Sequence, residues 1–271
     1  MISHQLANSL LDRVFRNQAY SPPASVWAAL AYREPSPEET VVDEVSTSGT
    51  GYGRKQWTGT AAKGRRTINS AKIQFADPLD IWSTDADPIK SIVLMDAETD
   101  GNILVSGSVL RPKKVLQYDP PVILYKGVLQ VYVNTKGVLL RTNLVHSLLD
   151  LVFNGGSYTP PATVYLGLVT RALSAAVAAA FEVSGGSYAR TAITFGAAVN
   201  GEILNSSPVK FPTSTAAWGS MANPICGLAV YTASSGGDWL AYMPVRPQRV
   251  PKGRTPTVET GTVRIALGAG L

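Results

Sequence analysis

Four aspartates crowd into one short stretch of the chain, where they could do chemistry together. Asp77, Asp80, Asp85 and Asp87 surround Trp82. A pair of carboxylates can act as acid and base in glycoside hydrolysis, and a tryptophan beside them can stack on a sugar ring. Carboxylate oxygens can also bind calcium, but this spacing does not match the twelve-residue calcium loop. An exposed polar loop is the simplest interpretation, so we treat these aspartates as interface candidates.

The two histidines and the single cysteine do not form a pattern typical of catalysis or of metal binding. His4 and His146 lie far apart in the sequence, and Cys226 lies in an apolar run expected to be a buried strand. Zinc sites need three or four ligands in close array, and a serine triad needs a histidine held by a carboxylate. No glycine-rich loop matches a phosphate-binding pattern. The sequence therefore predicts no catalytic residue, no bound metal and no cofactor.

A basic cluster near the end of the chain is the second candidate interface. Its members are Arg246, Arg249, Lys252 and Arg254. Such a cluster could contact an acidic protein surface or nucleic acid. The neighbouring prolines favour a solvated loop and disfavour the nucleic-acid alternative. The net charge is unevenly spread, because residues 1–135 carry 14 basic and 14 acidic side chains and residues 136–271 carry 10 and 5.

The two halves of the chain are nevertheless copies of one another. Residues 8–15 recur as 146–153, and residues 20–27 recur as 158–165, both at an offset of 138 residues. The offset drifts by about four residues toward the end, as small loop insertions would cause. Each copy has the size of an ordinary domain. The sequence therefore predicts two tandem domains, residues 1–135 and residues 136–271.

Each copy is expected to begin with one helix and to continue in β-strands. Apolar residues with helical periodicity run over residues 6–15 and 144–153, and the Tyr-x-Pro-Pro segment that follows cannot be helical. Short apolar or alternating runs, separated by Gly and Asn turns, fill the rest. This pattern predicts a mainly β fold of two antiparallel β-sandwich domains, each with one N-terminal α-helix on its sandwich. Strands of the second copy are expected at residues 163–169, 188–195, 209–211, 225–231, 239–242 and 262–267, and the alanine-rich residues 172–180 are expected to form a loop.

Several polar and aromatic residues are kept in both copies and are expected to serve the fold. They are Trp82 with Trp218 as core anchors, Arg54 with Arg190 in a fixed salt bridge or stack, and Asp12 with Asp150 as helix caps or ion-pair members.

The composition favours an assembled protein. Charged residues make up 16% of the chain, below the usual level of about 25%, and a weakly charged surface tolerates burial against other subunits. No apolar run approaches the length of a membrane span, and the N-terminus lacks the pattern of a signal peptide. We expect a protein that stays soluble in the cytoplasm where it is made, or joins an assembly there.

A set of residues in the second copy carries a family resemblance. It comprises Leu148, Leu149, Asp150 and Phe153, and the segments 158–168, 182–190, 211–219 and 240–242. Over nearly all of residues 138–267 this copy is similar to a small virion-protein domain of tailed bacteriophages that is usually labelled tail-fibre-like. The first copy looks like a divergent relative that carries the acidic loop. The resemblance implies a virion component and supplies no catalytic residue.

We therefore expect a non-enzymatic structural component of a tailed-phage virion, assembled in the host cytoplasm. Its partners would be other virion proteins of the capsid, neck or tail, in many copies or as a homo-oligomer, without a membrane. The different charge of the two copies, and the lack of a coiled-coil or glycine-repeat shaft, favour a head or neck decoration or a collar protein. A tail-fibre or receptor-binding protein that contacts a host-surface glycan is the alternative, and a glycoside hydrolase ranks third.

Overall fold

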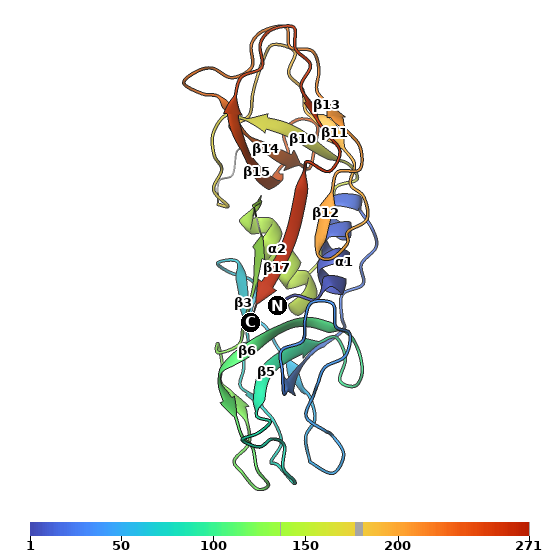
Figure 1. The fold of residues 1–271 in the computed structure, drawn as a ribbon, viewed down its shortest axis with the longest axis vertical. Coiled ribbons are helices and arrows are strands. Elements are labelled where there is room, and N and C mark those ends of the chain that lie inside the picture. Colours follow the sequence, from blue (N-terminus) through green and yellow to red (C-terminus); the bar gives the residue numbers. More distant parts are fainter. Residues whose placement is uncertain (136, 177–180, 271) are drawn as a thin grey trace.

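The computed structural model describes residues 1–135, 137–176 and 181–270 and shows an elongated, mainly β molecule (Figure 1). Two β-rich lobes lie at opposite ends of the long axis, and a sheet with two helices lies between them. All sheets are antiparallel, and one helix begins each repeat. The expected fold class is therefore confirmed.

The two lobes share a four-strand order, one repeat to each lobe, and the second lobe adds the edge strand β9. The first lobe contains a sheet of order β2-β1-β5-β6 and a ribbon of β4 with β7. These strands are β1 (Val26–Ala31), β2 (Lys55–Trp57), β4 (Ile73–Gln74), β5 (Ile89–Met95), β6 (Ile103–Lys113) and β7 (Ile123–Leu124). The second lobe contains a sheet of order β11-β10-β14-β15-β9 and a ribbon of β13 with β16. Its strands are β9 (Leu139–Leu140), β10 (Val164–Val169), β11 (Thr191–Ile193), β13 (Val209–Lys210), β14 (Ile225–Tyr231), β15 (Trp239–Gln248) and β16 (Thr257–Val258).

A third sheet belongs to both repeats. Its order is β12-β17-β8-β3, with β3 (Arg66–Ile68) and β8 (Gln130–Thr135) from the first repeat and β12 (Glu202–Leu204) and β17 (Arg264–Gly270) from the second. The closing strands β8 and β17 pair with each other, Leu267 opposite Thr135 and Ala269 opposite Val133. The two repeats are thus joined by main-chain hydrogen bonds around a pseudo-twofold axis. The limits of independent domains, residues 1–135 and 136–271, stay a prediction.

The two helices cover this central sheet in exchanged positions. Helix α1 (His4–Arg16) packs on β12 and β17 of the second repeat, and α2 (Thr142–Phe153) packs on β3 and β8 of the first. We expected each helix on the sandwich of its own repeat. The structure differs because α2 follows β8 after only the short strand β9, so the face of the first repeat is the nearest apolar surface. The chain ends lie close together, which places α1 against β17 in the equivalent way (Figure 1).

Each helix buries its apolar stripe at this exchanged contact. Leu10, Leu11 and Val14 of α1 are buried, as are Leu148 and Leu149 of α2. Aromatic rings join the helix ends to the opposite repeat. Phe15 lies 5.3 Å from Phe195 between ring centroids, and Phe153 lies 6.5 Å from Trp57. The helices therefore connect the hydrophobic cores of the two repeats.

Some boundaries differ from the expectation. The strand expected over residues 188–195 is limited to Thr191–Ile193, and the strand expected over 239–242 continues to Gln248. Residues 172–176 form no helix, as expected, and residues 177–180 lie outside the described residues. Cys226 lies in β14, but it is only partly buried and not the core residue that its apolar neighbours indicated.

Candidate interaction surfaces

The paired tryptophans are core anchors, as expected. Trp82 and Trp218 are both 1% exposed. Their indole Nε1 atoms donate hydrogen bonds to the backbone oxygens of Thr50 (2.8 Å) and Gly186 (2.9 Å). Because neither ring face is open to solvent, neither tryptophan can stack on a sugar.

The kept arginines form the expected fixed salt bridges, each extended by a tyrosine. In the first repeat, Arg54 Nη2 lies 2.7 Å from Glu44 Oε2, and Tyr52 Oη donates to Glu44 Oε1 at 2.7 Å. Arg54 also donates to the backbone oxygens of Ala97 and Asp100. Burial, with the nearby Glu44 carboxylate, raises the pKa of the Tyr52 phenol far above its ordinary value. This group therefore holds the β5–β6 hairpin in place and does not present a reactive side chain.

The second repeat contains the same arrangement. Arg190 pairs with Glu182 at 2.7 Å, donates to the backbone oxygens of Ala233 and Gly236, and lies over the Tyr231 ring at 3.5 Å. The Glu–Tyr–Arg arrangement is present in both repeats because in each it holds the equivalent β-hairpin in place.

Asp12 and Asp150 do more than cap helices or form ion pairs. Asp150 Oδ1 accepts from the backbone amide of Ala62, and Asp12 Oδ1 accepts from that of Ala198 while also pairing with Arg16. Both hydrogen bonds therefore run from a helix to the other repeat. Sequence reasoning missed this role, although the aspartates were kept at an offset of 138 residues.

The histidine of α2 also serves this contact between the repeats. His146 Nε2 accepts from the backbone amide of Arg65 at 3.0 Å. At the equivalent place on α1, Asn8 Oδ1 accepts from the amide of Gly201 at 2.8 Å. Arg65 and Gly201 both have a positive φ, so the same left-handed turn presents its amide in each repeat. His146 thus replaces an asparagine as a hydrogen-bond acceptor.

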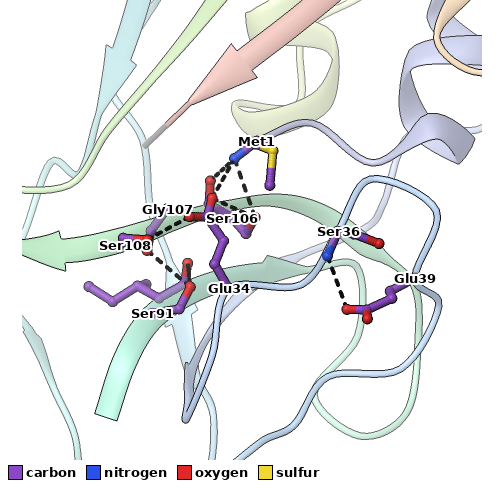
Figure 2. Close-up of polar contacts among 9 residues, drawn as sticks. Met1, Glu34, Ser36, Glu39, Ser91, Ser106, Gly107 and Ser108 are labelled. Carbon is purple, nitrogen blue, oxygen red and sulfur yellow. Dashed lines mark hydrogen bonds and ion pairs between the residues drawn. The ribbon is translucent and has the colours of Figure 1, made fainter. Parts of the chain in front are cut away.

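One cluster in the first lobe combines a carboxylate, hydroxyls and an amino group, as a catalytic site could. Figure 2 shows Glu34 between the Met1 amino group and β6, where Ser108 Oγ donates to Glu34 Oε2 at 2.6 Å. Partial burial opposes ionisation of Glu34, but the hydrogen bond from Ser108 and the nearby amino group outweigh it and lower its pKa. A carboxylate with a lowered pKa is a poor general base. Ala172 and Pro244 stand at the equivalents of Glu34 and Ser108, so the second repeat lacks the cluster.

The residues that the structure describes contain no group of three or more His, Cys, Asp and Glu side chains that could hold a metal ion. His4 lies 3.7 Å from Glu38, far from His146 and Cys226 in the sequence. Within the residues that the structure describes, no helix is both long and apolar enough to cross a membrane.

The four candidate aspartates all lie exposed at the end of the first lobe, but each makes its own local contact or none. Asp85 pairs with Lys114 at 2.6 Å, Asp87 approaches Lys90 at 4.0 Å, and Asp80 accepts from the amide of Ile81. No pair of them is enclosed in a cleft with the buried Trp82, as a glycoside hydrolase would need. Their assignment to an interface stays a prediction.

Three large apolar side chains lie among these aspartates, and sequence reasoning missed them. Leu79, Ile81 and Tyr118 are 59%, 50% and 79% exposed. The alternation of leucine and isoleucine with aspartate over residues 77–81 was a usable signal. Tyr118 is brought there only by the fold, through a hydrogen bond from its amide to the Pro78 oxygen at 3.0 Å.

The four candidate basic residues lie at the end of the second lobe. Arg246, Arg249, Lys252 and Arg254 are all exposed. Among the described residues, none of the four forms an ion pair, so their charges face solvent. The structure thus places the acidic and basic candidates on different lobes, at opposite ends of the molecule (Figure 1).

Comparison with known families agrees with this architecture. The family model described as podophage GP4 fiber I protein gp80 matches residues 1–131 and 140–266. The chain belongs to this family. The two matched segments correspond to the two repeats, so the resemblance to a tail-fibre-like phage domain in tandem copies is confirmed. Membership places the chain among the structural components of phage particles. No curated protein matches the chain.

Proposed function

We propose that this chain is a non-enzymatic connector on the surface of a phage particle, where each end lobe binds a different virion protein. The observation that carries this proposal is the divergence of the two lobe ends. Residues 77–87 present carboxylates and apolar side chains at the end of one lobe, and residues 249–254 present cations that form no ion pair among the described residues at the end of the other. Identical receptor-binding heads would be expected to keep the same loops. Ends that differ in chemistry instead suit two different neighbours.

The central sheet supports a connecting role. The pairing of β8 with β17 and the exchanged helices hold the two lobes at a fixed separation. A rigid chain of this kind suits a head or neck decoration or a collar protein, which must span neighbouring subunits. We place this chain in that region, in many copies and in contact with capsid, neck or tail subunits.

The proposal that the chain is not an enzyme rests on the structural contacts that its polar groups make. The kept Glu–Tyr–Arg groups close hairpins, the kept aspartates join the repeats, and the Glu34 cluster has a weakly basic carboxylate. These polar groups thus have structural tasks, and none of them is a free acid or base in a cleft.

The position of the chain in the intact particle tests the proposal. Electron cryo-microscopy of the virion, with an affinity tag on the chain visualised by gold labelling, should place it at the head or neck with different proteins at its two ends. Density only at the distal tip of a tail appendage would contradict the placement. Identical neighbours at both ends would contradict the connector role.

A receptor-binding fibre is the second candidate, and a cavity in the first lobe favours it. The cavity has a volume of about 570 Å³ and is lined by Thr40, Glu44, Thr47, Glu98 and Asp100, among others. Carboxylates and hydroxyls are suitable partners for the hydroxyl groups of a glycan. Saturable adsorption of the purified chain to host cells, abolished by Glu98→Arg, would favour this candidate over the connector.

A further inference from the structure

The end of the first lobe has the composition of a protein-binding surface. Leu79, Ile81 and Tyr118 supply exposed apolar area, and the carboxylates of Asp77 and Asp80 border it. We call these five residues the first end patch. An apolar centre with a charged border is the usual anatomy of a specific interface.

The backbone of this patch is well fixed. The Leu79 amide donates to the Thr50 oxygen at 2.9 Å, and the Gln117 side chain donates to the Leu79 oxygen at 2.9 Å. The patch is therefore held before any partner binds, which lowers the entropy cost of association.

At the end of the second lobe, the loop equivalent to residues 114–119 forms a basic surface. Arg249, Lys252 and Arg254, which we call the second end patch, are exposed and unpaired within the described residues. Their loop is fixed by two hydrogen bonds to Ser214, whose oxygen accepts from the Gly253 amide at 2.7 Å and whose amide donates to the Arg254 oxygen at 2.9 Å. This patch is therefore also held in shape.

The two patches occupy the same place in their lobes. The Trp82 amide donates to the Val115 oxygen at 2.9 Å, and the Trp218 amide donates to the Val250 oxygen at 2.9 Å. With the two tryptophans in register, Thr213 replaces Asp77. The end of the second lobe therefore lacks the acidic and apolar side chains that the end of the first lobe carries.

We propose that the first end patch binds the second end patch of another copy of this chain, so that copies join end to end. Carboxylates of one copy would pair with guanidinium and ammonium groups of the next, around the apolar centre of Leu79, Ile81 and Tyr118. Because the patches lie at opposite ends of one molecule, the contact is heterologous and does not close within a pair, so it builds strings. This inference rests on the proposed function, since it identifies one of the two neighbours as a second copy.

Because the two patches have opposite charges, a first end patch is expected to bind a second end patch and not another first end patch. Two first end patches would bring Asp77 and Asp80 of each copy together, and two second end patches would bring together three cations from each side. Like charges that face each other across an interface are unfavourable. Association of unlike ends should be weak at high salt, because exposed charges are screened.

Sedimentation velocity of the purified full-length chain is the first test. The mean mass should rise with protein concentration at a salt concentration of about 0.05 M and fall toward the monomer at about 0.5 M. A chain that is monomeric at every concentration and salt level overturns the inference. That result would leave the proposed function intact, because the position in the virion is measured separately.

Charge-reversed variants give the decisive test. Asp77→Lys with Asp80→Lys makes both ends basic, and Arg249→Glu with Lys252→Glu makes both ends carry acid. Each double variant alone should bind itself at least tenfold more weakly than the wild type, and an equimolar mixture of the two should associate again. A mixture that does not associate, or a variant that still associates by itself, overturns the inference.

A matched control separates local from overall charge. Glu38→Lys with Glu259→Lys alters the net charge as much as the aspartate double variant does, at exposed positions outside both patches. It should associate as the wild type does. Tyr118→Asn keeps the charges and is compatible with the positive φ at this residue. It should weaken association severalfold, and no change would overturn the apolar part of the contact. Circular dichroism melting verifies that every variant is folded.

Discussion

Asp150 of α2 accepts a hydrogen bond from the backbone amide of Ala62, 2.8 Å away and 88 residues earlier in the chain. The equivalent Asp12 of α1 accepts from Ala198 at 3.0 Å. In both cases a helix of one repeat satisfies an amide at the central sheet of the other. Each repeat therefore completes its partner, and the hydrogen bonds of the fold do not divide at the sequence boundary.

Removal of one of these carboxylates should destabilise the whole molecule. Asp150→Ala leaves the Ala62 amide, and the Asn154 side chain that also donates to Asp150, without this acceptor. We expect the free energy of unfolding in urea to fall by about 1–3 kcal/mol. Asp85→Ala removes an exposed, singly paired carboxylate and should change it by less than about 1 kcal/mol. Equal effects of the two substitutions would contradict the role of Asp150.

The chain should unfold in one cooperative transition. The exchanged helices and the β8–β17 pairing make the core of each repeat depend on the other. Circular dichroism and tryptophan fluorescence should therefore give coincident urea curves, with a slope appropriate to a single unit. Two separate transitions would show that each repeat is stable without its partner.

The second repeat, expressed alone as residues 136–271, should form a homodimer. Within the full chain, α2 and β17 both pack on the first repeat. A second copy of this repeat offers equivalent surfaces: Ala198 and Gly201 present the amides that Asp150 and His146 require. We expect a dimer by sedimentation equilibrium, and Asp150→Ala should shift it toward an unfolded monomer. A folded monomer would mean that the helix can return to its own repeat.

The sequence predicted the content of each repeat well, because local patterns determine it. The apolar stripe of α1 and the buried strand Ile225–Tyr231 were both expected and found. The exchange of helices could not be predicted in this way. A helix stripe such as Leu148 and Leu149 fits either half of a pseudo-symmetric sheet equally well, and the choice depends on the short connection after β8.

The candidate interfaces, too, could be predicted only as far as they are formed by residues close in sequence. Clusters close in sequence, such as Asp77 and Asp80 or Arg249 and Lys252, were visible from spacing and charge alone. Tyr118 was not, because it joins its patch through a turn some forty residues away. Their location at opposite ends follows from the central sheet, which no local pattern indicated.

Gly59 should be intolerant of a side chain, because the exchanged helix ends directly above it. A Cβ at this position would lie 2.0 Å from Asn154 Oδ1 and 3.0 Å from Trp57 Nε1. Gly59→Ala should therefore lower the free energy of unfolding by about 1–3 kcal/mol through overpacking. Gly53→Ala is the control, since nothing lies within 4 Å of its Cβ. If the two substitutions have the same effect, α2 does not pack as described.

The phenol of Tyr158 should make the fold sensitive to alkali. Burial raises its pKa to about 12, although Arg13 lowers it slightly, whereas an unfolded tyrosine has a pKa near 10. Because the folded pKa is the higher one, this contribution to stability is complete below about pH 10 and is lost as the pH rises through about 12. Urea unfolding at a series of pH values should show a steady decline over that window.

Two phenylalanine substitutions separate the ionisation of a phenol from its hydrogen bonds. The Tyr158 hydroxyl is buried and has no hydrogen-bond partner among the described residues. Tyr158→Phe should therefore leave the stability at pH 7 unchanged within about 1 kcal/mol and reduce the decline above pH 10. Tyr188 donates to Glu182 and accepts from the Leu168 amide, so Tyr188→Phe should cost about 1–3 kcal/mol already at pH 7. An alkaline decline as steep in Tyr158→Phe as in the wild type would show that this phenol does not control it.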